Sequence, residues 1–446
     1  MRIDDNVGLA AALGAGHPVL PVFIFDSDIL GKLKDRDDAR VSFIHELLKN
    51  LDHDLHTHGS GLEVHIGKPL EVFEKLIADH KIAAVYANHD YEPYAIRRDE
   101  QVELLLEENE IEFHTYKDQV IFEKDEVVKL DGSPYSVYSA YARKWRETLD
   151  PRDLKAAHAR FENLAKRKLN TIPSLERLGF TESSIPLPST HPSVDLRLVR
   201  KYHEVRDIPG VPGTSHMGAH LRFGSISIRK LVKIAQKEND TWLNELIWRE
   251  FFMQILWHYP HVASEPFRPE YSKIVWRHDV KDLHRWIEGK TGYPLVDAGM
   301  RELAATGFMH NRVRMVTASF LVKHLLIDPK EGERYFARKL FDYELSSNNG
   351  NWQWVAGSGC DAAPYFRVFN PTLQQKRFDA KAVYIKKWIP EYGTPKYPLP
   401  IVNHEEARER VLKAYKVALH RRGPTAPLKH EPRPQTKLKF SSTTKR

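Results

Sequence analysis

Two segments of the sequence hold side chains suited to binding a planar, charged ligand. Asn311, Arg314 and Met315 recur at intervals of three and four residues, so a helix would place them on one face. Further along, residues 342–354 combine carboxylates, amides and two tryptophans in one short stretch. A buried aromatic helix with an Asn-Asn-Gly capping turn would have the same composition, and both interpretations stand at this point.

Two more segments add charge and hydroxyl groups. Trp242, Glu245 and Arg249 lie at positions i, i+3 and i+7, so a helix would carry an indole, a carboxylate and a guanidinium on one side. A face that packs only into a core seldom carries all three. Residues 213–218 (Gly-Thr-Ser-His-Met-Gly) offer hydroxyls and backbone amides at a helix start, which could hold a phosphate, although an ordinary helix cap looks the same.

Composition sets the broad class of the protein. The chain has 446 residues, of which 41% are hydrophobic and 28% charged, as expected for a globular protein of two or three domains. Its net charge of +7 is compatible with a polyanionic partner but does not establish one. The single cysteine, Cys360, excludes an internal disulfide and a cysteine-based zinc site, and no metal site is expected. No apolar run is long enough to span a membrane, and we expect a cytoplasmic protein.

The elements that must position these residues fall into two kinds. Short apolar runs predict strands at 19–25, 62–66, 82–86 and 111–115. Helical patterns between them predict helices over 37–56, 69–79 and 93–108. This alternation predicts an α/β domain over 1–116 with a doubly wound parallel sheet. The Gly14-x-Gly16 pair precedes a strand instead of following one, so it is no dinucleotide-binding fingerprint.

The rest of the chain differs in pattern. Prolines interrupt residues 117–192, which predicts a surface connector with one charged helix near 152–167. Helical patterns and eight of the nine tryptophans fall between 193 and 420, which predicts an all-α domain. Residues 421–446 are rich in Pro, Thr, Ser and Lys and are expected to form a disordered basic tail.

Six segments together carry a family resemblance. They are Thr214-Ser215, Asn-Glu-Leu-Ile-Trp-Arg-Glu-Phe at 244–251, Glu-Gly-Lys-Thr-Gly-Tyr-Pro at 288–294, Met-His-Asn-Arg at 309–312, Asn-Asn-Gly-Asn-Trp-Gln-Trp at 348–354 and Asp-Ala-Ala-Pro-Tyr-Phe-Arg at 361–367. They closely resemble the DNA photolyase/cryptochrome family, and most of all its class I cyclobutane pyrimidine dimer photolyases. The resemblance covers the chain to about His420 and implies an α/β domain followed by an all-α domain that holds a bent FAD.

Residue matching to this family implies the cofactor contacts. Tyr202, Thr214, Ser215, His216, Met217 and Gly218 would hold the phosphates and ribityl chain, and Trp242, Glu245, Arg249, Asn311, Arg314, Asp342, Tyr343, Glu344 and Asn348 would line the flavin. A pair of Arg314 with Asp342 beside the ring can stabilise an anionic reduced flavin while staying neutral overall. The Asn348 amide would face flavin N5, where it can form a hydrogen bond but offers no acidic proton.

The resemblance also implies UV-damaged DNA as the substrate. A pyrimidine dimer must leave the duplex to reach a buried flavin, and its weakened stacking makes this step inexpensive. The residues matched to the dimer and its flanking backbone are Arg206, Glu245, Trp248, Arg249, Asn311, Arg312, Met315, Trp354, Arg367 and Gln374. Excited FADH⁻ would lend the dimer an electron, while Glu245 would stabilise charge on a dimer carbonyl. Asn311 and Met315 favour the cyclobutane dimer over the (6-4) lesion, whose enzymes carry a histidine pair.

Three departures from the family pattern affect these expectations. The family has an apolar strand before the segment that begins here at Arg2, so the sheet is expected to lack its first strand and the chain to be poorly soluble. Trp352 and Trp276 match the inner and exposed ends of an electron relay, but Pro329 replaces the middle tryptophan, which predicts slow flavin photoreduction or a detour through Trp286, Tyr335 or Tyr343.

The third departure concerns a second chromophore. Glu92 matches the acid that holds a folate antenna, but Val262 and Ala263 replace the expected Cys-Lys pair, so a methenyltetrahydrofolate or deazaflavin antenna stays open. The alternatives for the whole protein are a cryptochrome-type flavin photoreceptor that signals to a protein partner and a plain DNA-binding flavoprotein. We expect a monomer.

Overall fold

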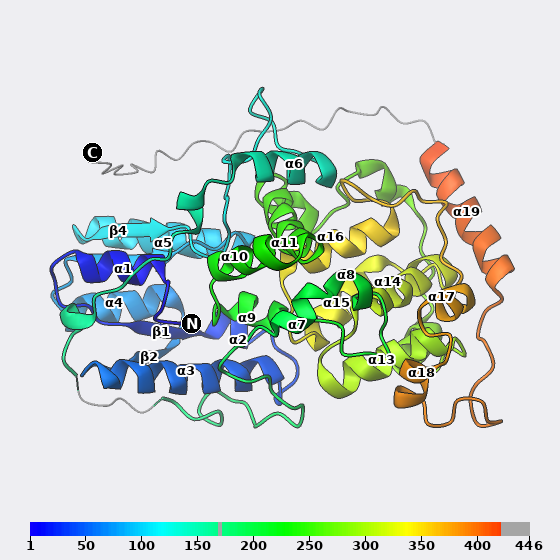
Figure 1. Cartoon of the computed structure of the whole chain (residues 1–446), viewed down its shortest axis with the longest axis horizontal. Helices are drawn as coiled ribbons and strands as arrows, with labels where there is room; N and C mark the ends of the chain where they lie inside the picture. The colour runs from blue at the N-terminus through cyan, green and yellow to red at the C-terminus, as the bar shows by residue number, and fades with distance from the viewer. Residues whose placement is uncertain (168–171, 421–446) are drawn as a thin grey trace.

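The structure is a computed structural model that describes residues 1–167 and 172–420 (Figure 1). The predicted disordered tail, 421–446, lies outside the described residues. In Figure 1 an α/β part, coloured blue and cyan, lies at the left, and a helical part, coloured green to red, lies at the right. None of the helices in the described ranges has both the length and the apolar character that crossing a membrane requires.

Strands and helices alternate in the first part of the chain, as predicted. The elements are α1 (Val7–Gly14), β1 (Val22–Asp26), α2 (Ser27–Leu30), α3 (Ala39–Thr57), β2 (Glu63–Gly67), α4 (Pro69–Asp79), β3 (Ala84–Asn88), α5 (Pro93–Glu108) and β4 (Glu112–Tyr116). Helices α4 and α5 each begin with a proline, which suits a first helical turn. The Asp38 side chain caps α3 by accepting a hydrogen bond from the Arg40 backbone N–H.

The strands pair in parallel, but as two separate pairs. Strand β1 pairs with β2, and β3 pairs with β4. A cavity of about 1040 Å³ lies between the pairs and is lined by consecutive residues of both inner strands, including Val22, Phe23 and Ile24 of β1 and Val85 and Tyr86 of β3. Because successive side chains of a strand point to opposite faces, this cavity must run along the strand edges. The described strands therefore form two parallel pairs with a cavity between them.

Residues 117–192 are more than a surface connector. They contain α6 (Tyr138–Thr148), whose Tyr141 and Trp145 are buried in the core. The predicted helix at 152–167 is wrong, because only short 3₁₀ turns form at Pro151–Leu154 and Phe161–Asn163. Backbone hydrogen bonds that a helix would need go instead to Val19, which pairs with the chain around Leu164.

Helices follow one another from residue 196 to 420, which confirms the predicted helical character of this part. Its helices are α7 (Leu196–Arg200), α8 (Tyr202–Val205), α9 (Met217–Phe223), α10 (Ile228–Glu238), α11 (Asp240–His258), α12 (Val280–Ile287), α13 (Pro294–Thr306), α14 (Asn311–Ser319), α15 (Pro329–Lys339), α16 (Leu345–Ala356), α17 (Pro371–Phe378), α18 (Val383–Trp388) and α19 (His404–His420). A π-helical turn, Phe320–His324, follows α14.

Helices α11 and α16 cross at the centre of the helical part, between two hydrophobic cores. Ile247 and Phe251 of α11 belong to one core, and Trp352 and Val355 of α16 to the other. The crossing is close because Gly350 has no side chain, and a Cβ there would overlap the ring of Phe252. The crossing therefore sets the geometry of everything that α11 and α16 carry.

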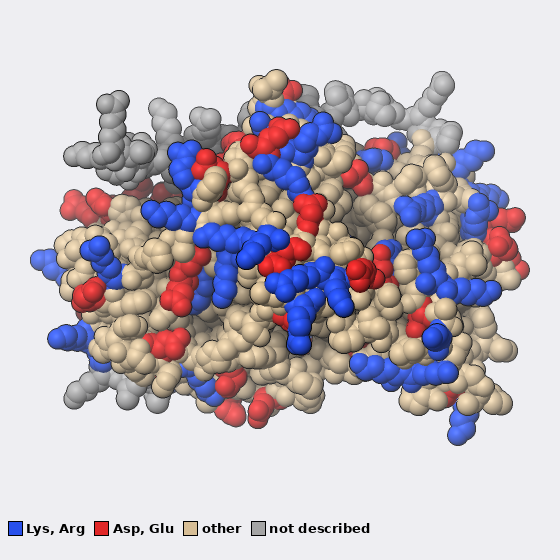
Figure 2. Space-filling view, viewed as in Figure 1, with Lys and Arg blue, Asp and Glu red and all other residues tan. Residues whose placement is uncertain are grey.

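Charge is unevenly spread over the surface. Figure 2 shows Lys and Arg gathered over α7 and α10 on the face in view, with Asp and Glu among them. The exposed cations of these helices include Arg197, Arg200, Lys230, Lys233 and Lys237. A local excess of this kind favours a polyanionic partner more than net charge alone does.

Candidate active site

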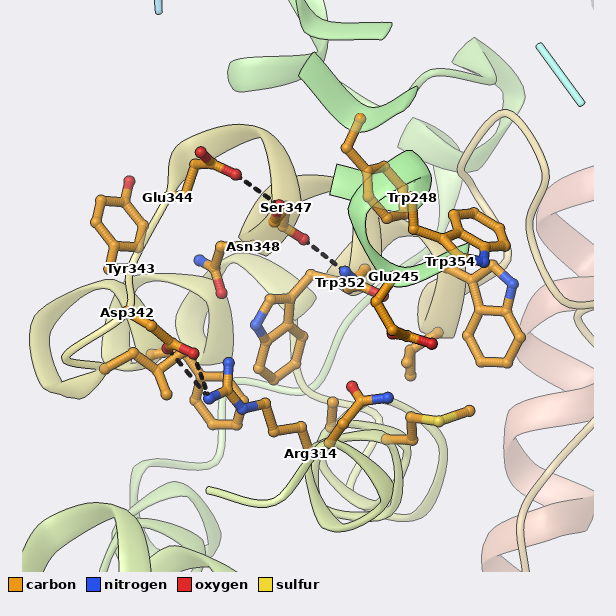
Figure 3. A pocket seen from close by; sticks show the side chains of 18 of the residues that line it. Glu245, Trp248, Arg314, Asp342, Tyr343, Glu344, Ser347, Asn348, Trp352 and Trp354 are labelled. Carbon is orange, nitrogen blue, oxygen red and sulfur yellow. Dashed lines mark hydrogen bonds and ion pairs between the residues drawn. The ribbon is translucent and has the colours of Figure 1, made fainter. Parts of the chain in front are cut away.

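A cavity of about 350 Å³ opens between α11, α14, α15 and α16. This volume falls in the usual range for small-molecule sites, roughly 300–1,000 Å³. Figure 3 shows its lining, with Trp248, Trp354 and Glu245 on one side, Asp342, Tyr343 and Glu344 on the other, and Trp352 between them. The predicted residues that line it are Arg206, Glu245, Trp248, Asn311, Arg312, Arg314, Met315, Asp342, Tyr343, Glu344, Asn348, Trp352 and Trp354.

Helix α14 brings Asn311, Arg314 and Met315 to the cavity together, as their spacing predicts. The helix starts here because His310 caps it, its Nδ1 accepting a hydrogen bond from the Arg312 backbone N–H (3.1 Å). Arg314 Nη2 contacts both carboxylate oxygens of Asp342, at 3.1 and 2.9 Å. The predicted ion pair therefore forms, and it puts a fixed cation and anion side by side at the cavity wall.

Helix α16 carries the amide side of the cavity. The alternative of an Asn-Asn-Gly capping turn is wrong, because Asn348 and Asn349 lie inside the helix and are buried. Asn348 Nδ2 donates to the Glu333 carbonyl (3.1 Å), which leaves the side-chain oxygen of Asn348 available as an acceptor. At the helix start, Glu344 is held by Arg249 Nη2 (3.1 Å) and accepts a hydrogen bond from Ser347 Oγ (2.8 Å).

The opposite side of the cavity is lined by the aromatic rings of Trp248 and Trp354 and by the Glu245 carboxyl group. Trp248 stacks on Tyr138 of α6, with ring centroids 3.5 Å apart and planes 6° from parallel. Glu245 forms an ion pair with Arg206. Burial raises the pKa of Glu245, and Arg206 opposes that rise, so this carboxyl keeps a proton more readily than a free one. Tyr138 was missed by sequence reasoning, because it lies in the connector, where no periodic pattern marks it.

Of the residues predicted to contact the DNA backbone, Arg206 and Arg312 line the cavity, whereas Arg367 and Gln374 do not. Arg312 Nη2 pairs with Asp207 (2.7 Å), and its guanidinium lies over the Phe378 ring, 4.4 Å from the centroid. Arg367 is exposed and lies over Phe369, and Gln374 is partly buried on α17; neither lines the cavity. Asp207 is a second residue that the sequence did not single out.

The predicted phosphate-holding turn lies beside the cavity and does not line it. Trp242 Nε1 donates to Ser215 Oγ (3.3 Å), which ties α11 to the turn that contains Thr214. A Cβ at Gly218 would be 3.1 Å from Asp342 Oδ2, so the backbone there closely approaches the Arg314–Asp342 pair. Tyr202 of this predicted set is buried, and the Arg206 guanidinium lies over its ring. Burial lowers the pKa of His216. Met217 is buried in the core.

The two ends of the predicted electron relay are placed differently. Trp352 is buried and lines the cavity. Trp276 is partly buried, not exposed as predicted, and packs edge-on against Tyr415 of α19 with centroids 6.1 Å apart. Pro329 forms the first turn of α15.

Glu92 does not offer a free carboxylate to an antenna. It forms an ion pair with Arg222, whose Nη2 lies 2.9 Å from a Glu92 carboxylate oxygen. Val262 is buried, and its carbonyl accepts hydrogen bonds from Asn349 Nδ2 (2.9 Å) and Gln353 Nε2 (3.1 Å). These residues are engaged within the protein, so a second chromophore stays a prediction.

Comparison with known proteins gives consistent matches. The family model for DNA photolyase matches residues 1–160, and that for the FAD binding domain of DNA photolyase matches residues 242–396. The deoxyribodipyrimidine photo-lyase of Synechococcus sp. is 34% identical over 93% of this chain and 94% of its own.

Solved structures extend the likeness to the fold. A class III photolyase from Agrobacterium tumefaciens has a TM-score of 0.81 and 31% identity, covering 94% of this chain and 95% of its own. A cryptochrome from Synechocystis sp. has a TM-score of 0.80 and 25% identity, covering 93% of this chain and 96% of its own.

Proposed function

Because this chain belongs to the DNA photolyase family, we propose that it is a light-driven repair enzyme that splits cyclobutane pyrimidine dimers in DNA. The observation that supports this best is a single cavity in which Asn348, Arg314 and Asp342 lie opposite Trp248 and Trp354. Bound FAD, when reduced and excited by blue light, supplies an electron to the dimer and takes it back after the ring opens. The residues of the chain supply binding, orientation and charge.

One end of the cavity suits a reduced flavin ring. The Arg314 guanidinium stabilises negative charge on the ring, while Asp342 balances the arginine in the absence of that charge. Asn348 Oδ1 would accept a hydrogen bond from a protonated nitrogen of the bound ring, because the Asn348 amide nitrogen already donates to the Glu333 carbonyl. An amide neither gains nor loses a proton at neutral pH, so it holds that nitrogen without titrating it.

The other end suits a flipped-out dimer. Trp248 and Trp354 provide apolar surfaces for two adjoining bases, and Tyr138 fixes the Trp248 plane by stacking beneath it. The raised pKa of Glu245 favours its protonated form, which can donate a hydrogen bond to a base carbonyl on which negative charge develops.

Two arginines link the cavity to the DNA backbone. Arg206 and Arg312 are paired with Glu245 and Asp207. Phosphates compete for both guanidiniums, so DNA binding exchanges these carboxylate contacts for phosphate contacts and depends on salt. Exchange at Arg206 also frees Glu245 to reach the dimer.

A repair assay tests the proposal. Purified protein with chemically reduced FAD is mixed with an oligonucleotide that carries one thymine dimer, and dimer loss is followed under blue light and in darkness. We expect light-dependent repair, and Trp248→Ala should weaken dimer binding by roughly 1–3 kcal/mol because one stacking surface is lost. Trp388→Phe, on α18 and outside the cavity, serves as the control. Absence of repair by the unaltered protein would reject the proposal.

A flavin photoreceptor is the second candidate, supported by the similarity to the Synechocystis cryptochrome. Such a protein would bind FAD and respond to light without splitting the dimer, so the same assay separates the two. Assignment to class I, the four-part domain division, the monomeric state and the cytoplasmic location stay predictions.

A further inference from the structure

A chain of aromatic rings leads from the cavity towards the surface along α15. The Trp352 ring at the cavity lies 6.3 Å, centroid to centroid, from Trp286 of α12, and Trp286 lies 5.8 Å from Tyr335 of α15. Trp352 and Trp286 are buried, whereas Tyr335 is only partly buried. Three oxidisable rings therefore connect the cavity wall to solvent.

The chain is held by close packing. Trp286 Nε1 donates to the Thr317 carbonyl (3.0 Å), which orients the indole and places a carbonyl dipole beside it. The Phe336 ring packs against both indoles, with centroids 6.0 Å from Trp286 and 5.0 Å from Trp352. At the outer end, Tyr335 lies near the Arg338–Asp35 ion pair.

The relay expected from the family pattern, from Trp352 through position 329 to Trp276, offers no such connection. Pro329 has no π system that could hold a radical, and Trp276 packs against Tyr415 under α19. The route through Trp286 instead consists of direct ring contacts.

We propose that Trp286 and Tyr335 replace the electron that Trp352 gives to photoexcited oxidised FAD. This inference rests on the proposed function only in assuming that FAD occupies the cavity. One electron passes from Trp352 to the flavin, one from Trp286 to Trp352, and one from Tyr335 to Trp286. Tyr335 releases its phenolic proton to water and becomes a neutral radical, and a small thiol in solution returns a hydrogen atom to it. The net change is one electron gained by the flavin, one proton released to water and one thiol converted to a thiyl radical.

Photoreduction of the holoprotein tests the route. Oxidised FAD in the protein is illuminated with blue light in the presence of a thiol, and its loss of absorbance is followed. We expect Trp286→Phe and Tyr335→Phe to lose most of the photoreduction seen in the unaltered chain, and Trp276→Phe to retain it. Tyr392→Phe, in the same hydrophobic core as Tyr335, is the matched control and should retain it too.

Electron paramagnetic resonance gives a readout independent of flavin turnover. Freezing under illumination should trap a tyrosyl radical whose spectrum narrows when the protein contains ring-deuterated tyrosine, and this signal should be absent from Tyr335→Phe. If Trp286→Phe does not fold, Tyr335→Phe still decides, because it removes only a hydroxyl group.

Two outcomes would overturn the route: photoreduction lost in Trp276→Phe but kept in Trp286→Phe and Tyr335→Phe, or a tyrosyl signal that persists in Tyr335→Phe. Dimer splitting with chemically reduced FAD should survive in Tyr335→Phe. Failure of the unaltered chain to split dimers, with the tyrosyl signal intact, would reject the repair function and leave this route standing.

Discussion

Gly332 lies on α15 against the indole of Trp352. A Cβ at this position would overlap that indole and would lie 2.6 Å from Leu321 Cδ2, so α15 can approach Trp352 only because residue 332 has no side chain. We expect Gly332→Ala to destabilise the protein by roughly 1–3 kcal/mol, as overpacked cores do, and to weaken FAD retention because Trp352 lines the cavity. Thermal denaturation and flavin release measure the two effects.

Gly14, at the end of α1, is the matched control. A Cβ there meets nothing within 4 Å, and alanine is the better helix former, so Gly14→Ala should leave stability unchanged or slightly raised. Unaltered melting and flavin retention in Gly332→Ala would refute the packing argument.

Lys323 makes stability depend on pH. Its Nζ is buried, donates to the Ala356 and Tyr365 carbonyls (3.1 and 3.2 Å) and lies over the Tyr415 ring. Burial lowers the Lys323 pKa from 10.5 to about 7, so above pH 7 the unfolded chain holds a proton that the folded chain has lost. The free energy of unfolding should therefore rise between about pH 7 and pH 10, by up to about 1.4 kcal/mol per pH unit.

Urea unfolding at several pH values measures this dependence. Lys323→Met keeps the length of the side chain without the charge and should flatten the profile. Parallel profiles for the two proteins would show that Lys323 does not cause the rise.

The spacing of residues in the sequence predicted which side chains share one face of a helix, but it did not predict contacts between distant segments. Asn311, Arg314 and Met315 reach one cavity because a helical period fixes their common face. Tyr138 and Gly332 could not be found this way. One stacks on Trp248 from a connector without periodicity, and the other matters only because Trp352 comes from a different helix.

At the scale of elements, the helix starts predicted at prolines were the most accurate boundaries. Helices α4 and α5 begin at the predicted Pro69 and Pro93, because proline suits the first helical turn and disfavours the interior. Strand β1 begins three residues later than predicted, at Val22, since the apolar run starts before the first residue that pairs with β2. The helix predicted at 152–167 failed because pairing with Val19 is a long-range contact.

At the scale of the whole molecule, the α/β and helical parts share a hydrophobic cluster. Phe43 of α3 is fully buried, and its ring lies 5.2 Å from Phe341 and 5.7 Å from Phe223 of α9. Phe341 directly precedes Asp342 at the cavity. Packing of α3 therefore supports the segment that pairs with Arg314.

This arrangement predicts that a destabilising substitution in α3 also weakens FAD binding. Phe43→Ala should cost roughly 3–5 kcal/mol and should release FAD in the same thermal transition that unfolds the α/β part. Leu106→Ala, at a fully buried position of α5 packed only within the α/β part's own cluster, should cost roughly 2–5 kcal/mol without earlier flavin release. Circular dichroism and flavin fluorescence recorded in one melt distinguish the cases. Flavin release unchanged in Phe43→Ala would mean that the shared cluster does not couple the two parts.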